Sequence, residues 1–206
     1  MSTHSSVPSA GSSARAILDA AAQLFIQKGY RKVTTREIAA AAGVNLGLIP
    51  YYYTSKENLA AAVMRDANDQ AYAAVFRTLP EDLGCAERLY LSTLLLWKQF
   101  SGEAMVFFLD YLECCGYTQV SKTFEHMAEE VLCHYGLHIE PHRHALFLHA
   151  LKGAESQMLI ALHKGELQAT QEEISRIILT NYFYNIGLSD VQIRSILQNC
   201  EKYIPV

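Results

Sequence analysis

Histidine, cysteine and acidic side chains gather in the second half of the chain, and these residue types can bind metal ions. All histidines except His4 lie between residues 126 and 163. His126, Glu130 and His134 recur every four residues, so they share one face of a predicted helix, with Cys133 adjacent. The opposite face is apolar and consists of Phe124, Met127, Ala128, Val131, Leu132 and Tyr135. A metal-sensing site is one interpretation, but we favour a solvated helix face.

The five cysteines are odd in number and irregularly spaced, which favours free thiols. The adjacent pair Cys114 and Cys115 could form a redox or soft-metal switch; burial as small apolar side chains is the favoured alternative. Cys133 and His134 have the types of a nucleophile and its base, but adjacent residues of a helix do not face each other. The sequence contains no phosphate-binding loop or metal-hydrolase motif. We therefore expect no enzyme, no cofactor and no bound metal.

Charge is distributed unevenly along the chain, whose formal net charge is −4. Residues 1–58 carry six basic and three acidic side chains, a net charge of +3, so the remainder carries −7. A basic N-terminal segment joined to an acidic body is typical of a small DNA-binding domain attached to a second domain.

Apolar residues recur with helical spacing along most of the chain, and no run of alternating β-branched residues marks a strand. We therefore predict an all-α protein. The first helix is expected to begin after Ser12 or Ser13 and to end at Gly29. Further helices are expected at roughly 85–100, 103–114, 118–135, 142–164, 170–186 and 189–202. Capping boxes at Thr170 and Ser189 should begin the last two.

A glycine turn between two short helices is expected near residue 43. Thr34, followed three residues later by a glutamate, predicts a capping box that begins the second helix. Gly43 permits a tight turn with positive φ, and Asn45 is the predicted N-cap of the third helix. Thr54, also followed by a glutamate at the third position, should begin a long helix that runs through Phe76. This arrangement fits a helix-turn-helix; a plain helical hairpin is the alternative.

The stretch ILDAAAQLFIQKGYRKVTTREIAAAAGVNLGLIPYYYTSKENL resembles the N-terminal domain of TetR-family transcriptional regulators. The resemblance rests on AAAQLFIQKGY, on T-x-R-E-I-A-x-A-A-G-V and on Y-Y-Y-x-S-K-E-x-L, which are specific in combination. It implies a homodimer that binds double-stranded DNA at a palindromic operator. It also implies a C-terminal helical domain that binds a small-molecule effector and mediates dimerisation.

The same resemblance places the DNA contacts on the start of the second helix, on the third helix and on the start of the fourth. The corresponding residues are Thr34, Thr35, Arg36, Asn45, Leu46, Gly47, Leu48, Pro50, Tyr51, Tyr52 and Lys56. Family members commonly carry a small hydroxyl residue at position 48 and Tyr or Asn at position 50, so Leu48 and Pro50 depart from the pattern.

The chemistry of these side chains suggests different roles at the DNA. Arg36 is the one arginine among them, and arginine pairs with guanine through two hydrogen bonds. Leu46 and Leu48 can contact only thymine methyl groups. The hydroxyls of Tyr51 and Tyr52 can bind phosphates, which position a protein without reading sequence.

Pro50 is an unexpected residue for a recognition helix. With Asn45 as N-cap, the proline is the fifth helical residue, and a hydrogen bond to the Leu46 carbonyl is lost at a cost of about 3 kcal/mol. The hypothesis is that the first turn loosens or tightens and leaves the Leu46 carbonyl facing water or DNA. Tyr53 is expected to pack inward against the first helix.

Small and apolar residues of the last long helices form the predicted dimer interface, and packing within one subunit is the alternative. The predicted interface residues are Ala150, Gly153, Ala154, Gln157, Ala161, Ile174, Ile178, Asn181 and Tyr182. Aromatic and sulfur-containing residues of the middle helices form the predicted effector pocket. They are Tyr90, Trp97, Phe100, Phe107, Phe108, Tyr111, Cys114, Phe124 and Met127.

The expected organisation is a disordered tail (1–12), a helix-turn-helix domain (13–58, the motif itself at 34–53) and a ligand-binding and dimerisation domain (59–206). We expect a repressor that a mostly apolar effector releases from DNA by shifting the population of two states. A regulator without an effector, or a metal- or redox-sensing one, is the alternative. The N-terminus lacks the features of a signal peptide, and no run approaches the roughly 20 apolar residues that span a membrane, so we expect a cytoplasmic protein.

Overall fold

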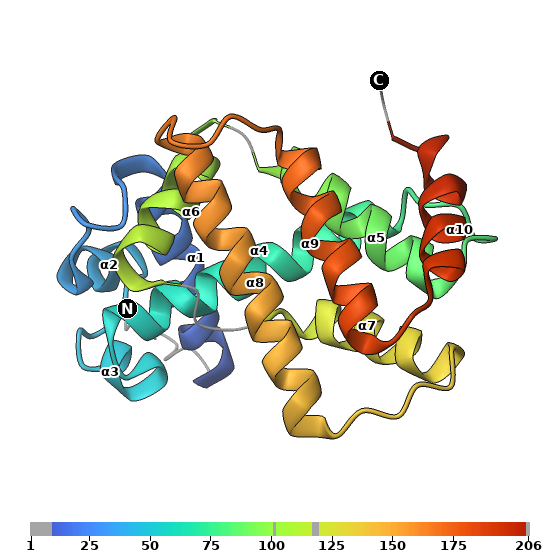
Figure 1. Ribbon diagram of the computed structural model, residues 1–206. Coiled ribbons are helices and arrows are strands. Elements are labelled where there is room, and N and C mark those ends of the chain that lie inside the picture. The colour runs from blue at the N-terminus through green and yellow to red at the C-terminus, as the bar shows by residue number, and fades with distance from the viewer. Residues whose placement is uncertain (1–9, 101, 117–119, 205–206) are drawn as a thin grey trace, which may run out of the picture. The chain divides into compact units, whose positions relative to one another are not determined.

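All regular elements that the computed structural model describes, in residues 10–100, 102–116 and 120–204, are helices (Figure 1). This confirms the predicted all-α class. The helices are α1 (Ala10–Lys28), α2 (Thr35–Ala41), α3 (Leu48–Tyr53), α4 (Lys56–Phe76), α5 (Cys85–Leu96), η1 (Trp97–Gln99), α6 (Gly102–Cys115), α7 (Lys122–His134), α8 (Pro141–His163), α9 (Gln171–Ile186) and α10 (Asp190–Glu201). Most of the predicted tail lies outside the described residues, and residues 10–12 are the start of α1.

The chain forms two compact units. The first consists of Met1–Asp66 and Gly102–Cys115, and the second of Ala67–Ser101 and Gly116–Val206. Neither unit coincides with the predicted domains, because α6 joins the N-terminal helices although it follows α5 in the chain. Phe107 of α6 stacks on Phe25 of α1, with the ring centroids 5.4 Å apart. The division at residues 58 and 59 therefore stays a sequence-based prediction.

The first unit has a core of apolar side chains from its N-terminal helices. Ile17 and Phe25 of α1, Ile38 of α2 and Ile49 of α3 are each at most 1% exposed. The Tyr53 hydroxyl donates a hydrogen bond to the Ala14 carbonyl at 2.8 Å, and burial raises the pKa of this phenol. The prediction that Tyr53 packs inward against the first helix is thus confirmed.

In the second unit, α8 and α9 pack side by side (Figure 1). The capping boxes predicted at Thr170 and Ser189 are present and begin α9 and α10. Each side-chain oxygen accepts from a backbone N–H three residues later, which satisfies one of the donors that a helix start leaves free.

The interior of the second unit contains a charged pair. The Lys152 Nζ lies 2.9 Å from the Glu155 Oε2, and the two residues are 5% and 3% exposed. Lys152 also donates to the Tyr72 hydroxyl at 3.2 Å, and the indole of Trp97 donates to Glu155 at 3.3 Å. Buried charges require such partners, because each one loses its hydration shell.

None of the described helices combines the length and the apolar character needed to cross a membrane.

Candidate nucleic-acid interface

The start of α2 is held by a capping box, as predicted. The Thr34 hydroxyl accepts from the Glu37 N–H at 3.2 Å, and the Glu37 carboxylate accepts from the Thr34 N–H at 2.9 Å. Hydrogen bonds from Lys28 and from Thr34 lower the pKa of Glu37 to about 2. The Thr34 hydroxyl also donates to Glu37 at 2.9 Å, so its hydrogen bonds are used for capping. Arg36, the second residue of α2, is exposed.

The third helix starts later than predicted. Its first residue is Leu48 and its N-cap is Gly47, so Asn45 is not the cap of this helix. The Asn45 side-chain oxygen instead accepts from the Gly47 N–H at 2.9 Å, and its carbonyl accepts from the Leu48 N–H at 3.0 Å. These contacts form a turn ahead of α3, because asparagine side chains readily hydrogen-bond to the backbone two residues on.

The later start of α3 resolves the difficulty raised by Pro50. Pro50 is the third helical residue, and the first N–H groups of a helix have no partner within the helix, so the proline removes no hydrogen bond. The Leu46 carbonyl accepts from the Ile49 N–H at 3.2 Å, a contact three residues apart that tightens the turn. The first turn is thus tightened, and the Leu46 carbonyl is not left free, because it accepts from Ile49.

A patch of α3 and the preceding turn is exposed in the first unit. Tyr51 is 76% exposed and Leu46 41%, while Ile49 beside them is 1% exposed and anchors the helix in the core. The rings of Tyr51 and Tyr52 meet edge-on, with centroids 4.9 Å apart. Gly47 and Pro50 are also exposed, and Leu48 is half-buried.

The start of α4 differs from the prediction by one residue. The Ser55 hydroxyl accepts from the Asn58 N–H at 3.2 Å, so Ser55, and not Thr54, caps the helix. Thr54 instead ends α3 with φ +65°, and the Ser55 N–H bonds to the Tyr53 carbonyl at 2.6 Å. This is a three-residue turn that reverses the chain between α3 and α4.

Lys56, the predicted phosphate ligand, is held by an aromatic ring. Its Nζ lies 4.4 Å from the centroid of the Tyr30 ring, within the range of a cation–π contact. The Tyr30 hydroxyl donates to the Glu57 carboxylate at 3.3 Å. Sequence reasoning missed Tyr30, because nothing local in the sequence shows which side chain a residue in the turn after α1 will meet.

All the predicted DNA-contact residues therefore lie in the first unit, on the start of α2, the turn, α3 and the first residue of α4. The predicted pocket residues, by contrast, belong to both units. Phe107, Phe108, Tyr111 and Cys114 lie on α6 of the first unit, and Tyr90, Trp97, Phe100, Phe124 and Met127 lie in the second.

The predicted dimer residues divide by exposure. On α8, Ala150, Ala154 and Gln157 are exposed, and Gly153 and Ala161 are half-buried. On α9, Ile174, Ile178 and Tyr182 are at most 5% exposed. These three are buried within the chain itself, which corrects the predicted surface, whereas Ile177, Asn181 and Tyr184 are exposed.

The histidine cluster shows no convergence on a metal. His126 and Glu130 lie 3.6 Å apart on the exposed side of α7. Among the residues that the structure describes, no group of three or more histidine, cysteine or acidic side chains is arranged to hold a metal ion.

The compact first unit, with its glycine turn and an exposed third helix anchored by Ile49, defines a helix-turn-helix protein. Comparison with known proteins supports the assignment of a helix-turn-helix. Residues 17–63 match the sequence model described as "Bacterial regulatory proteins, tetR family". Residues 17–63 of the first unit are thus similar to the N-terminal domain of TetR-family regulators.

Similar sequences carry regulator names. The HTH-type transcriptional repressor KstR2 of Rhodococcus jostii (strain RHA1) is 38% identical over 56 residues, 27% of this chain and 28% of KstR2. The HTH-type transcriptional regulator BetI of Escherichia coli O127:H6 (strain E2348/69 / EPEC) is 36% identical over 77 residues, 36% of this chain and 38% of BetI. The matches thus span less than two-fifths of these relatives.

Similar folds extend over nearly the whole chain. RolR in complex with resorcinol superposes with a TM-score of 0.55 at 19% identity, covering 96% of this chain and 97% of RolR. The multidrug binding protein EbrR in complex with imidazole gives a TM-score of 0.52 at 18% identity, covering 92% and 99%. At these identities the likeness shows the shared fold.

Proposed function

We propose that this protein is a ligand-responsive transcriptional repressor that binds a palindromic operator as a homodimer and is released by a small, mostly apolar effector. We also propose a cytoplasmic location, because DNA is the proposed partner. The observation that carries the proposal is the exposed surface of α3 and its turn, with Tyr51 76% exposed, in a family of regulatory proteins. The net charge of +3 over residues 1–58 supports it.

The proposed base contact is Arg36, and the proposed phosphate contacts are Tyr51, Tyr52 and Lys56. Arg36 is exposed at the start of α2, where the capping box fixes the backbone. Lys56 begins α4, whose free N–H groups and dipole also favour a phosphate. The contact with Tyr30 restricts the conformations that the Lys56 side chain can adopt.

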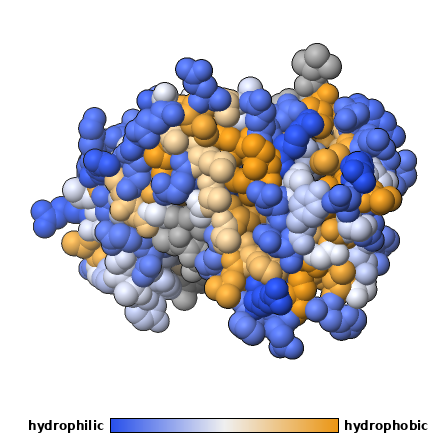
Figure 2. Space-filling model, in the orientation of Figure 1, coloured by the Kyte–Doolittle hydropathy of each residue, from blue (hydrophilic) through white to orange (hydrophobic). Residues whose placement is uncertain are grey.

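The proposed dimer surface lies on α8 and α9 of the second unit. Figure 2 shows a band of hydrophobic surface over these two helices. Leu146 is 65% exposed, Ile177 53% and Tyr184 49%, and the small residues Ala150 and Ala154 between them permit close approach of helices. Dimerisation would present two recognition helices to half-sites about 34–36 Å apart, or a multiple of that distance.

The proposed effector is small and mostly apolar, because aromatic side chains are frequent in the middle helices. RolR was crystallised with resorcinol and EbrR with ethidium, and both ligands are aromatic. We propose that the effector stabilises a state in which the two recognition helices no longer match the spacing of the half-sites.

The test is selection of duplexes from a random-sequence pool, followed by binding titrations at several salt concentrations. Arg36→Ala should weaken binding by about 1–3 kcal/mol and relax the base preference at one position of each half-site. Lys56→Ala should weaken binding to all sequences alike and lower the salt slope by about one. Arg194→Ala on α10, an exposed arginine outside the proposed interface, is the matched control.

Failure of the protein to enrich any duplex would refute DNA recognition. A screen of small molecules for release of the selected duplex distinguishes the proposed ligand-responsive repressor from a regulator without an effector. Release of DNA by an apolar or aromatic compound supports the proposal, and constant affinity across the screen contradicts it.

A further inference from the structure

Two adjacent thiols lie in the unit that contains the helix-turn-helix. Cys114 and Cys115 are the last residues of α6, and Gly116 follows with φ +68°. Cys114 is exposed and Cys115 is half-buried. The role proposed above for the recognition helix does not use either thiol.

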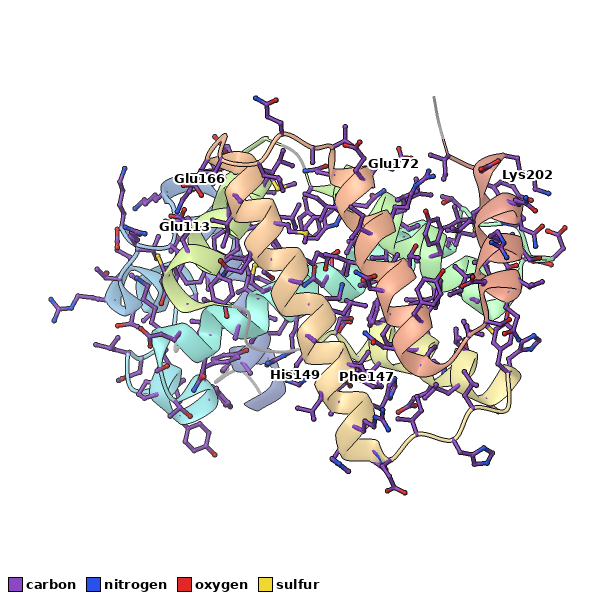
Figure 3. All side chains as sticks on the ribbon, in the orientation of Figure 1. Glu113, Phe147, His149, Glu166, Glu172 and Lys202 are labelled. Atoms are coloured by element: carbon purple, nitrogen blue, oxygen red, sulfur yellow. The ribbon has the colours of Figure 1, made fainter. Side chains whose placement is uncertain are left out.

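Cys114 is held against the turn between α1 and α2. The Arg31 Nε donates to the Cys114 Sγ at 2.9 Å and lies 3.1 Å from the Asp110 Oδ1. The guanidinium also lies 3.8 Å from Glu113, which projects from α6 in Figure 3. The Cys114 thiol is 3.8 Å from the Asp110 carboxylate. The Cys114 thiol is exposed to solvent, so an oxidant can reach it.

The end of α6 also contacts the residue that holds Lys56, because the ring of Tyr111 meets the ring of Tyr30 edge-on, with centroids 6.0 Å apart. Burial and a hydrogen bond with Cys115 raise the pKa of Tyr30 far above its usual value, and Glu57 adds to this shift. The same Tyr30 side chain bonds to Glu57 and lies under the Lys56 ammonium group. The end of α6, which carries the two thiols, is therefore connected to the proposed phosphate ligand through Tyr111 and Tyr30.

We propose that Cys114 and Cys115 are a peroxide-oxidation site whose oxidation weakens DNA binding. The Cys114 thiolate attacks one peroxide oxygen, the O–O bond breaks, and a sulfenic acid and water form after protonation. The Cys115 thiolate then attacks the sulfenic sulfur, the S–O bond breaks, and a disulfide and a second water form. Overall, the two thiols lose two electrons and two protons to the peroxide.

A disulfide between these neighbours does not fit an α-helix. The side chains of neighbouring residues point about 100° apart around an α-helix, so the two sulfurs are not directed at each other there. Oxidation must therefore unwind the last turn of α6. The contact of Cys114 with Arg31 then breaks, and Tyr111, which packs against Tyr30 beneath Lys56, is displaced. The effect on DNA binding rests on the proposed DNA-binding function.

The test compares reduced and peroxide-treated full-length protein on a duplex that the reduced protein selects from a random pool. We expect a mass loss of about 2 Da located at the Cys114–Cys115 peptide. We also expect faster hydrogen exchange at the end of α6 and a loss of DNA affinity of about tenfold or more. Dithiothreitol should reverse all three. Cys114→Ser should abolish the mass change and the peroxide effect, and Cys133→Ser, which removes an exposed thiol of α7, should respond like the parent.

The absence of this crosslink, or its formation with unchanged exchange in α6, would overturn the proposal. Unchanged affinity for the selected duplex would do the same. If the reduced protein selects no duplex at all, the proposed function fails instead, and mass and exchange still decide whether the oxidation unwinds α6.

Discussion

At the scale of single residues, the position of Pro50 in α3 determines how much it costs the fold. As the third helical residue it removes no hydrogen bond of the helix, and its fixed φ suits the first turn. Pro50→Ala should therefore change the free energy of unfolding by no more than about 1 kcal/mol, through the entropy of the unfolded chain. Urea denaturation measures this change.

The matched comparison is Ala62→Pro in the interior of α4, which should cost about 3 kcal/mol or more. A stabilisation by Pro50→Ala as large as that cost would show that the proline strains the helix, contrary to the structure.

Thr54 stores backbone strain between α3 and α4. Its φ of +65° is a rare conformation for a β-branched residue, which we expect to cost about 1–3 kcal/mol. Thr54→Gly should stabilise the protein by about 1 kcal/mol after the entropy cost of glycine is subtracted. The midpoint of thermal unfolding should rise accordingly.

The control for Thr54→Gly is Ala40→Gly, an exposed position of α2 with ordinary helical geometry, where glycine should destabilise by about 1 kcal/mol. Equal destabilisation by both substitutions would rule out strain at Thr54.

At the scale of elements, the buried pair on α8 makes the second unit sensitive to the loss of one charge. Glu155→Gln keeps an acceptor for Trp97 but leaves the Lys152 charge uncompensated, and should destabilise the protein by about 3–5 kcal/mol. The double variant Lys152→Met with Glu155→Leu should recover most of that loss, because two apolar side chains need no compensation. Denaturant titrations of the three proteins test this, and an equally unstable double variant would contradict it.

His144 connects α8 to α9 and makes this contact depend on pH. Its Nε2 lies 2.8 Å from the Tyr182 hydroxyl, and burial lowers its pKa below 6.5, although Glu125 and Glu129 oppose the shift. The folded state therefore binds fewer protons than the unfolded chain, and this contribution to stability is lost as the pH falls below about 6.5.

His144→Gln keeps a polar partner for Tyr182 and removes the titration. Unfolding free energies measured at several pH values between about 7.5 and 5.5 should fall less steeply for this variant than for the parent. Parallel profiles would show that His144 does not titrate between the two states.

At the scale of the whole molecule, the proposed dimer would bury the exposed apolar side chains of α8 and α9. Ala154→Arg places a bulky charge in the proposed dimer surface and should shift sedimentation from dimer to monomer while helicity by circular dichroism is kept. Gln198→Arg, an exposed position of α10, should sediment like the parent. If Ala154→Arg still sediments as a dimer, the interface lies outside the proposed surface.

The sequence alone determined the all-α class, the helix-turn-helix and three of the helix starts. The capping boxes at Thr34, Thr170 and Ser189 are hydrogen bonds within three residues, so short stretches of sequence specify them. The start of α3 was predicted two residues early and the start of α4 one residue early, because Asn45 and Thr54 have cap-forming side chains but adopt other turns.

Tertiary structure decided which surfaces remain exposed and which distant residues meet. It placed α6 with α1, buried Ile178 and Tyr182 inside their own subunit, and brought Arg31 to Cys114. Helical periodicity shows that a face is apolar, but it does not show which segment covers that face. Packing between segments far apart in the chain makes that choice, because burial depends on all the neighbours that the folded chain supplies.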